Sequence, residues 1–147
     1  MFKVDPRKSI FYYIDEAIKE YRKYAQKKIS VIDPNITLDQ LLTLNLIKED
    51  PDSSQKELAQ ILFKDYASLT RIIELLVKKS YLSRSINQSD RRKFVLKLTA
   101  KGHTIVDKLT PVIIENRKIA LKNISDTDLK SLKATLKTIT DNCKSDL

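Results

Sequence analysis

The stretch that decides the fold is Tyr81-Leu-Ser-Arg-Ser-Ile-Asn-Gln-Ser-Asp-Arg-Arg-Lys-Phe-Val-Leu-Lys-Leu-Thr-Ala-Lys-Gly102. It is the only segment whose pattern indicates a β-hairpin, in a chain otherwise patterned for helices. The alternation of its side chains predicts strands at residues 82–87 and 93–99. The turn between them holds one acid and three consecutive cations, Asp90, Arg91, Arg92 and Lys93. A hairpin with a cationic tip is suited to reach along a phosphate backbone or into a groove.

Two capping boxes, each of which satisfies free backbone groups at a helix start, precede the hairpin. Thr37 with Gln40 begins one helix, and Ser54 with Glu57 begins a second, short one. A further helix is predicted about four residues later, from Tyr66 to Lys79. Two short helices joined by a tight turn form a helix-turn-helix.

The predicted helix at residues 66–79 has two distinct sides. Its apolar side carries Leu69, Ile72, Ile73 and Leu76. The opposite side carries Ala67, Arg71, Glu74 and Lys78, with Ser68 and Thr70 on the flanks. Small polar groups and an arginine near the start of a second helix are what contacts to base edges and phosphates require. A merely solvated helix face would show the same pattern, so this pattern alone leaves both interpretations open.

The outer parts of the chain are predicted to be helical. Asp5 is the expected N-cap of a first helix that runs to about Lys28, and residues 30–36 are expected to form a loop. Thr99 can cap a long helix that reaches Asn123, and Ser125 can cap a last one. The fold class is therefore mainly α with a small β-wing: a winged helix-turn-helix with helical extensions at both ends.

Charge and composition limit the function. The 147 residues fit one domain and carry a net charge of +9. Residues 64–101 hold ten cations and three acids, a net +7, whereas the other 109 residues hold 18 cations and 16 acids, a net +2. Such a concentration of positive charge favours a polyanion as partner, although a solvated surface is the alternative.

Several kinds of chemistry are not expected. His103 is the only histidine and Cys143 the only cysteine, which excludes a histidine cluster for a metal and an internal disulfide in one chain. Cys143 is predicted to be buried apolar filler rather than an oxidant sensor. We find no glycine-rich phosphate loop or nucleophile elbow, so we expect no enzyme and no cofactor. The absence of a signal peptide and of a long apolar run favours the cytoplasm, away from membranes.

The sequence resembles the MarR family of bacterial transcription regulators over most of the chain. The resemblance rests on the runs Ser68-Leu-Thr-Arg71, Leu76-Val-Lys-Lys79, Arg84, Asp90-Arg91-Arg92 and Leu98-Thr99-Ala-Lys-Gly102. It departs from the family at Ser80. A glycine usually ends the helix at this position, because glycine adopts the left-handed backbone conformation at the lowest energetic cost. Gly102, the only glycine, is expected to permit close packing where the second strand meets the next helix.

The resemblance implies a role for each matched residue. Ser68, Thr70 and Arg71 would lie in the DNA major groove or on its phosphates. Arg92 would enter the minor groove at the wing tip, with Asp90 orienting its guanidinium. The remaining DNA-binding candidates are Arg84, Arg91 and Lys93, of which Arg91 and Lys93 would contact phosphates.

The resemblance also implies a homodimer on a pseudopalindromic operator. The dimerisation helices would be residues 5–30 and 100–145, and the DNA-binding lobe residues 37–100, within a single domain 1–147. Apolar stripes on these helices exceed what one small winged helix can cover, namely Phe11, Ile14, Ile18, Val112, Ile113, Leu132, Leu136 and Ile139. Stripes that fold back on the monomer are the alternative.

A small-molecule effector that releases a repressor from DNA is the regulation that the family implies. Tyr12 and Tyr13, in a cluster with Tyr21 and Tyr24, are candidates for a phenolic-ligand pocket. Packing within the dimer is the interpretation we prefer for these tyrosines. The alternative function for the whole chain is a winged helix used as a protein-interaction or structural module.

Overall fold

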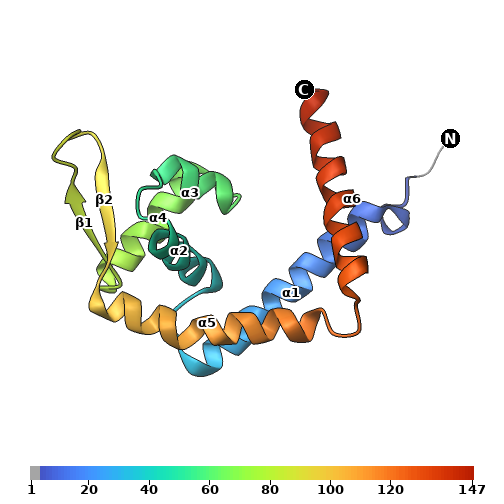
Figure 1. Cartoon of the computed structure of the whole chain (residues 1–147), viewed down its shortest axis with the longest axis horizontal. Coiled ribbons are helices and arrows are strands. Elements are labelled where there is room, and N and C mark those ends of the chain that lie inside the picture. The colour runs from blue at the N-terminus through green and yellow to red at the C-terminus, as the bar shows by residue number, and fades with distance from the viewer. Residues whose placement is uncertain (1–3) are drawn as a thin grey trace. The chain divides into compact units, whose positions relative to one another are not determined.

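The computed structural model describes residues 4–147 and is mainly helical, with one two-stranded antiparallel hairpin (Figure 1). In chain order the elements are the 3₁₀ helix η1 (Pro6–Lys8), α1 (Ile10–Ile32), α2 (Leu38–Glu49), α3 (Gln55–Ile61), α4 (Tyr66–Lys78), β1 (Leu82–Ile86), β2 (Phe94–Leu98), α5 (Ala100–Ala120) and α6 (Asp126–Ser145). The chain divides into two compact units between Asn116 and Arg117. The predicted fold class is confirmed.

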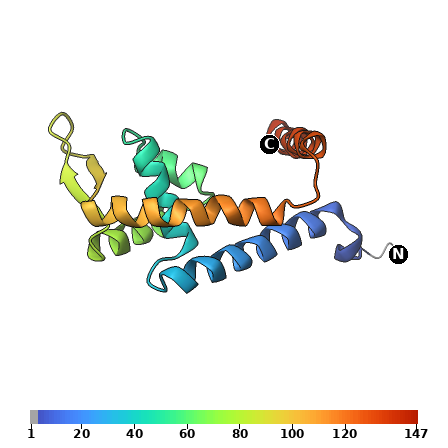
Figure 2. The same cartoon turned by 60° about the horizontal axis from the view of Figure 1, so that its bottom comes forward.

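The hydrophobic core lies in the first unit. It combines the second half of α1 with α2, α3, α4, the hairpin and the first part of α5. The side chains of Leu41, Leu44, Leu69, Ile73 and Leu109 have no exposed surface. Figure 2 shows the helix-turn-helix of α3 and α4 beside α2, with the hairpin leaving this lobe at the end of α4. The core therefore fixes α4 and the base of the hairpin on one scaffold.

Both predicted capping boxes are confirmed. The Thr37 hydroxyl accepts the Gln40 N–H at 3.1 Å, and the Gln40 side chain accepts the Thr37 N–H at 3.1 Å. Ser54 and Glu57 make the same two bonds at 3.1 Å each. These short local interactions set the starts of α2 and α3 without help from the rest of the fold.

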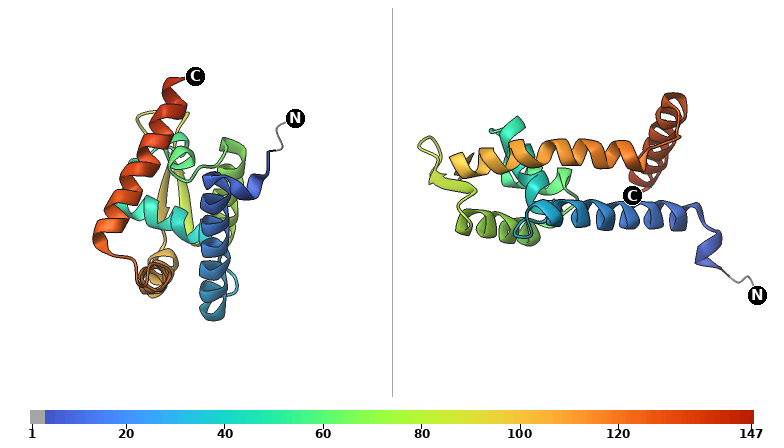
Figure 3. Two further views of the ribbon diagram at one scale, coloured as in Figure 1. Left: turned by 90° about the vertical axis from the view of Figure 1, so that its right-hand side faces the viewer. Right: turned by 90° about the horizontal axis from the view of Figure 1, so that it is seen from below.

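The first helix begins later and ends later than predicted. Asp5 caps only η1, and Ser9 caps α1 by accepting the Phe11 N–H at 3.2 Å. The prediction of a loop over residues 30–36 is wrong for its first part, because α1 continues to Ile32. Ile29 is fully buried, which anchors the last turn of the helix against the core. The N-terminal half of α1 extends away from the lobe (Figure 3).

The long helix ends at Ala120, three residues before the predicted end. Asn123 lies in the left-handed region with φ 65°, which breaks the helix before Ser125 caps α6 by accepting the Asp128 N–H at 3.1 Å. Cys143 is exposed, so the prediction that it is buried filler is wrong. The reason is that α6, within its own unit, buries no residue.

The hairpin has the predicted strands, of which β1 ends one residue earlier than predicted and β2 is shorter by one residue at each end. Its register pairs Leu82 with Leu98, Arg84 with Leu96 and Ile86 with Phe94. Leu82 at the base and Leu96 in the middle of β2 are buried, whereas Ile86 and Phe94 at the outer end are more than half exposed. The hairpin is therefore attached at its base, and its outer half is solvated.

The base of the hairpin is fixed at the corner where α4 ends and α5 begins. Ser80 occupies the left-handed region with φ 65°. Its N–H donates to the Val77 carbonyl at 3.0 Å, and the Tyr81 N–H donates to the Leu76 carbonyl at 2.9 Å. This pair of bonds is a Schellman ending, for which glycine is the usual residue. Ser80 accepts the strained conformation, so the helix ends at the position that the family pattern predicts.

Gly102 is required at this corner by space alone. A Cβ atom there would lie 2.2 Å from the carbonyl oxygen of Tyr81, which is backbone and cannot rotate away. The Gly102 N–H donates to the Thr99 hydroxyl at 3.0 Å, and this hydroxyl donates to the carbonyl of Ser80. The close packing expected of the only glycine is confirmed.

Gly102→Ala should lower the free energy of unfolding by about 2 kcal/mol, because the clash outweighs the gain in helix propensity of about 1 kcal/mol. Urea unfolding followed by circular dichroism measures this change. Thr104→Ala, an exposed position two residues later on α5, is the matched control and should change stability by less than about 0.5 kcal/mol. Equal unfolding midpoints for Gly102→Ala and the parent chain would contradict the steric argument.

Candidate nucleic-acid interface

The outward side of α4 carries the residues that the sequence placed there. Leu69, Ile73 and Leu76 are fully buried, which fixes the rotation of the helix about its axis. Ala67, Ser68, Arg71 and Glu74 are all exposed. Tyr66 is 59% exposed at the start of this surface, a residue that sequence reasoning did not single out. The first two turns of α4 thus present small, polar and cationic groups to solvent.

Asp65 is the N-cap of α4 and the sequence analysis missed it. Its carboxylate accepts the Ser68 N–H at 2.7 Å. Hydrogen bonds from the backbone and side chain of Ser68 lower the pKa of Asp65, with a smaller contribution from the charge of Lys64. The cap could have been found, because an aspartate directly before an apolar-periodic helix is a common start signal.

The hydroxyl of Thr70 is already engaged within the protein. It donates to the Tyr66 carbonyl at 2.9 Å and accepts from the Gln55 side-chain amide at 2.6 Å. The second bond ties the start of α3 to α4. Thr70 therefore positions the two helices of the helix-turn-helix, and Gln55 is a further polar group beside α4 that the sequence did not indicate.

The wing tip is shaped by two side chains that cap backbone groups. Asn87 accepts the N–H groups of Ser89 at 2.8 Å and Asp90 at 3.2 Å. The Asp90 carboxylate then accepts the Arg92 N–H at 3.0 Å, and the Asp90 carbonyl accepts the Lys93 N–H at 3.0 Å. These bonds close the loop tightly without a glycine.

Asp90 fixes the backbone of Arg92 rather than its guanidinium. Within residues 4–147 no ion pair joins the Asp90 carboxylate to a cation. Arg91, Arg92 and Lys93 are all exposed at the tip. The Asp90 carboxylate therefore closes the turn through the main chain. Its expected effect on the orientation of the Arg92 guanidinium stays a prediction.

Arg84 is held against an aromatic ring. Its guanidinium carbon lies 4.7 Å from the centre of the Phe94 ring on the paired strand. Its Nε atom is buried and has no hydrogen-bond acceptor among the described residues. Stacking of this kind fixes an arginine head in place. Arg84 thus lies on the stem of the wing rather than at its tip.

Some of the clustered cations have structural roles. Lys64 pairs with Asp39 at 2.9 Å. Lys79 donates to the carbonyl of Asn35, and Lys101 donates to the carbonyl of Lys79 at 2.9 Å. These three lysines hold loops and helix ends together. The charge available to a polyanion is therefore concentrated on α4 and on the wing.

Asp39 links three segments of the first unit. Its carboxylate accepts from Arg22 on α1 and from Lys64 in the turn between α3 and α4. Burial alone would raise the pKa of Asp39, but the hydrogen bonds and charges of Lys64 and Arg22 outweigh it and lower the pKa from its ordinary 3.8. The charged form is therefore favoured by folding.

A carboxylate whose pKa falls on folding stabilises the protein above its unfolded pKa, and this contribution is lost as the pH falls through the folded pKa. Asp39→Asn should therefore be less stable than the parent chain by about 1 kcal/mol at neutral pH, after allowance for solvent screening. The difference should shrink below about pH 4. Urea unfolding across this pH range measures it.

Asp15→Asn is the control for this experiment. Asp15 pairs with Lys19 at 2.7 Å, but the two side chains are 60% and 72% exposed, so the pair contributes little. A pH-independent difference between Asp39→Asn and the parent chain would contradict the role assigned to the Asp39 carboxylate.

The two candidate ligand-binding tyrosines lie on the surface of α1. The rings of Tyr12 and Tyr13 are perpendicular, with centres 5.9 Å apart, and the residues are 41% and 58% exposed. Tyr21 packs against the core instead. Within one chain the structure therefore places Tyr12 and Tyr13 on an open surface.

Two further features concern the described residues only. In residues 4–147 no three side chains of His, Cys, Asp or Glu gather where they could hold a metal ion. None of the helices in this part of the chain combines the length and the apolar character needed to cross a membrane.

Comparison with known proteins gives consistent results. The model of the MarR family matches residues 36–94, which contain the helix-turn-helix and the wing up to the start of β2. The chain is 30% identical over 102 residues to the HTH-type transcriptional repressor NicR of Pseudomonas putida. The match covers 69% of this chain and 60% of that relative, so the chain spans less than two-thirds of its length.

Solved structures share the fold. BpsR of Bordetella bronchiseptica superposes with a TM-score of 0.83 at 18% identity, over 95% of this chain and 99% of that one. The DNA binding of BpsR is regulated by 6-hydroxynicotinic acid. A mutant of Escherichia coli MarR in complex with operator DNA superposes with a TM-score of 0.78 at 25% identity, over 86% and 90% of the two chains. The helix-turn-helix, the wing and these similarities show that the chain resembles the MarR family, whose model it matches over residues 36–94.

Proposed function

We propose that the chain is a sequence-specific regulator of transcription that binds double-stranded DNA. The observation that carries the proposal is the pair of exposed surfaces that one core holds together, the first turns of α4 and the cationic wing tip. A helix with small polar residues and an arginine suits the major groove. An exposed arginine on a narrow hairpin suits the minor groove.

In this proposal the residues divide by role. Ser68 and Arg71 contact base edges or phosphates in the major groove, and Thr70 sets the position of α4 there. Arg92 enters the minor groove from a loop that Asp90 closes. The remaining contacts, to phosphates, come from Arg84, Arg91 and Lys93.

The proposed active form is a homodimer on a pseudopalindromic operator. In the first unit Ile10, Phe11 and Ile18 on α1 are between 48% and 60% exposed, more apolar surface than one helix of a monomer usually leaves in water. In the second unit Leu132 is 50% exposed on α6. A second copy that covers these surfaces would bring two recognition helices to neighbouring half-sites.

The name of NicR supports a repressor, and the description of BpsR supports control by a small molecule. We extend both properties to this chain as part of the proposal, with the cytoplasm as its location and no enzymatic activity. Tyr12 and Tyr13 serve dimer packing in this view, or line an effector site once a second copy encloses them.

Arg92→Ala should weaken binding to the cognate operator by about 1–3 kcal/mol, because the guanidinium is lost from the minor groove. The operator is first recovered by selection of bound genomic fragments. Fluorescence anisotropy then gives the affinities over a range of salt concentrations, and binding should fall steeply as salt rises.

Lys108→Ala is the matched control, since Lys108 is an exposed cation on α5 outside both surfaces. It should bind the operator like the parent chain. Absence of any duplex binding at low salt would refute the proposal and favour a protein-interaction module. An effect of Arg92→Ala restricted to non-specific DNA would refute the minor-groove assignment.

The dimer makes a separate prediction. Light scattering at micromolar concentration should give twice the chain mass of 17.0 kDa. The double variant Phe11→Glu with Ile18→Glu should give the mass of one chain, because two buried carboxylates in an apolar interface are costly. Lys56→Glu, on the exposed side of α3, should remain dimeric; a monomeric parent chain would refute the assembly.

A further inference from the structure

Two aromatic side chains are exposed where α3 turns into α4. Phe63 is 94% exposed and Tyr66 is 59% exposed. Phe63 is the most exposed aromatic residue in the part of the chain that the structure describes. Tyr66 is the first residue of α4. These two residues, which we call the turn aromatics, therefore stand at the start of the helix that carries Ser68 and Arg71 on its exposed surface.

The backbone holds Phe63 in the left-handed region, with φ 54°. The Phe63 N–H donates to the Gln60 carbonyl at 3.2 Å, and the Lys64 N–H donates to the Ala59 carbonyl at 2.9 Å. These bonds form a Schellman ending of α3, in which glycine is the usual left-handed residue. A phenylalanine is strained there, and a ring that stays in water recovers none of this cost by burial. The fold of one chain therefore gives no reason for an aromatic residue at this position.

The turn presents the Phe63 ring from a fixed backbone. Directly after Phe63, Lys64 pairs with Asp39 at 2.9 Å. The next residue, Asp65, accepts the Ser68 N–H at 2.7 Å and caps α4. Because these bonds follow Phe63 and the Schellman bonds precede it, the main chain is held on both sides of the ring. A side chain on such a support is suited to a contact that distinguishes between partners.

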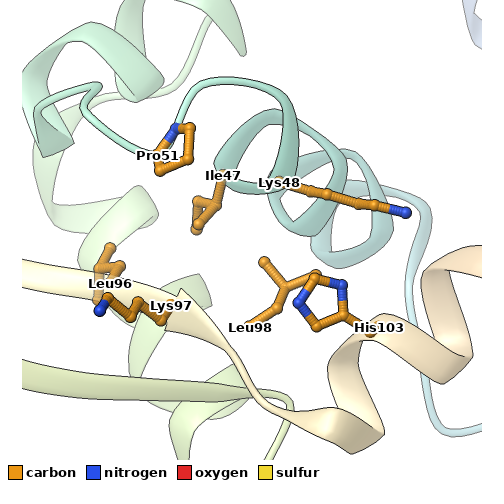
Figure 4. A pocket seen from close by; sticks show the side chains of 7 residues that line it. All are labelled: Ile47, Lys48, Pro51, Leu96, Lys97, Leu98 and His103. Atoms are coloured by element: carbon orange, nitrogen blue, oxygen red, sulfur yellow. The ribbon is translucent and has the colours of Figure 1, made fainter.

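The turn aromatics project into solvent and do not line a recess. The apolar recess of this lobe lies elsewhere, between the end of α2, β2 and the first turn of α5 (Figure 4). It has a volume of about 250 Å³, and its walls include the buried residues Ile47 and Leu96. A residue that is 94% exposed encloses nothing. The partner of Phe63 must therefore bring a surface of its own to the ring.

The base edges in the major groove of DNA offer such a surface. Ala67, Ser68 and Arg71, in the first two turns of α4, are exposed beside the turn aromatics. The major groove presents hydrogen-bonding groups and one kind of apolar group, the 5-methyl group of thymine. Phosphates are a poorer match, because they repel the Asp65 carboxylate that lies between the two aromatic residues in the chain. An apolar contact at this end of α4 therefore fits a thymine methyl group.

We propose that Phe63 and Tyr66 pack against thymine methyl groups in the major groove and so select thymine at defined positions of the operator. This inference rests on the proposed DNA-binding function. The hairpin leaves from the opposite end of α4, a helix of 13 residues that is about 20 Å long (Figure 1). The selected thymines therefore lie at the end of the α4 contact that is far from the base of the wing.

Exchange of thymine for uracil in the operator tests this contact, because it removes the methyl group and leaves the hydrogen-bonding groups of the base unchanged. Operator duplexes that carry deoxyuridine at one thymine of each half-site are compared by fluorescence anisotropy. At a contacted position the parent chain should bind about fourfold more weakly for each half-site, which corresponds to the loss of one buried methyl group. At thymines outside the contact the affinity should not change.

Phe63→Gly removes the ring and relieves the strained backbone, so the variant should fold, which circular dichroism verifies. It should bind the thymine operator about fourfold more weakly than the parent chain for each half-site. It should also no longer distinguish thymine from uracil at the contacted position, because the two changes remove the same contact. Tyr66→Ala should lose this distinction at a second thymine.

Val31→Ala is the matched control, since Val31 is 79% exposed on α1, outside α4 and the wing. It should bind the thymine and uracil duplexes like the parent chain.

Three results would overturn the methyl contact and leave the DNA-binding function standing. The first is a parent chain whose affinity no exchange of thymine for uracil changes. The second is a Phe63→Gly variant that loses equal affinity for both duplexes, which would indicate a structural role. The third is an unchanged affinity of Phe63→Gly, which would assign the ring to a protein partner. Absence of any duplex binding at low salt would refute both the proposed function and this inference.

Discussion

Gly102 packs against the carbonyl oxygen of Tyr81 so closely that a Cβ atom would lie 2.2 Å from that oxygen. This approach brings the start of α5 onto the end of α4, at the residue where the chain turns into the wing. Ser80 makes the turn possible by adopting a left-handed conformation, and its carbonyl then accepts from Thr99. The angle between α4 and the hairpin depends on this one corner. The relative position of the two proposed DNA-binding surfaces, the first turns of α4 and the wing tip, therefore depends on it as well.

The corner also explains why a serine can replace glycine at the helix end. The left-handed conformation costs a residue other than glycine about 1–2 kcal/mol. In this conformation the N–H groups of Ser80 and Tyr81 make the two Schellman hydrogen bonds to the end of α4. The Ser80 carbonyl accepts a third hydrogen bond from the Thr99 hydroxyl. The three-way junction therefore overdetermines the conformation, and the local strain does not change the course of the chain.

Local signals in the sequence predicted most of the fold. Capping boxes at Thr37 and Ser54, and the alternation in the hairpin, depend on neighbours within a few residues, and each is confirmed. Two of the errors concern burial, which depends on contacts between distant segments. Burial of Ile29 carries α1 past the predicted loop, and Cys143 is exposed because α6 buries nothing within its own unit. Such contacts have no periodic signature in the sequence.

The candidate site was predictable in its residue types but not in their roles. Sequence patterns cannot tell a cation that faces a partner from one that holds a loop, because both are lysines or arginines in a basic stretch. The structure separates Lys64, Lys79 and Lys101, whose ammonium groups bond within the protein, from Arg91, Arg92 and Lys93 at the exposed wing tip. The hydrogen bonds also change the roles assigned to Asp90 and Thr70. The Asp90 carboxylate accepts from the Arg92 N–H, and the Thr70 hydroxyl accepts from the Gln55 side-chain amide. Specific recognition then requires that these fixed groups hold a few exposed ones in place, because a flexible cation attracts any phosphate but distinguishes none.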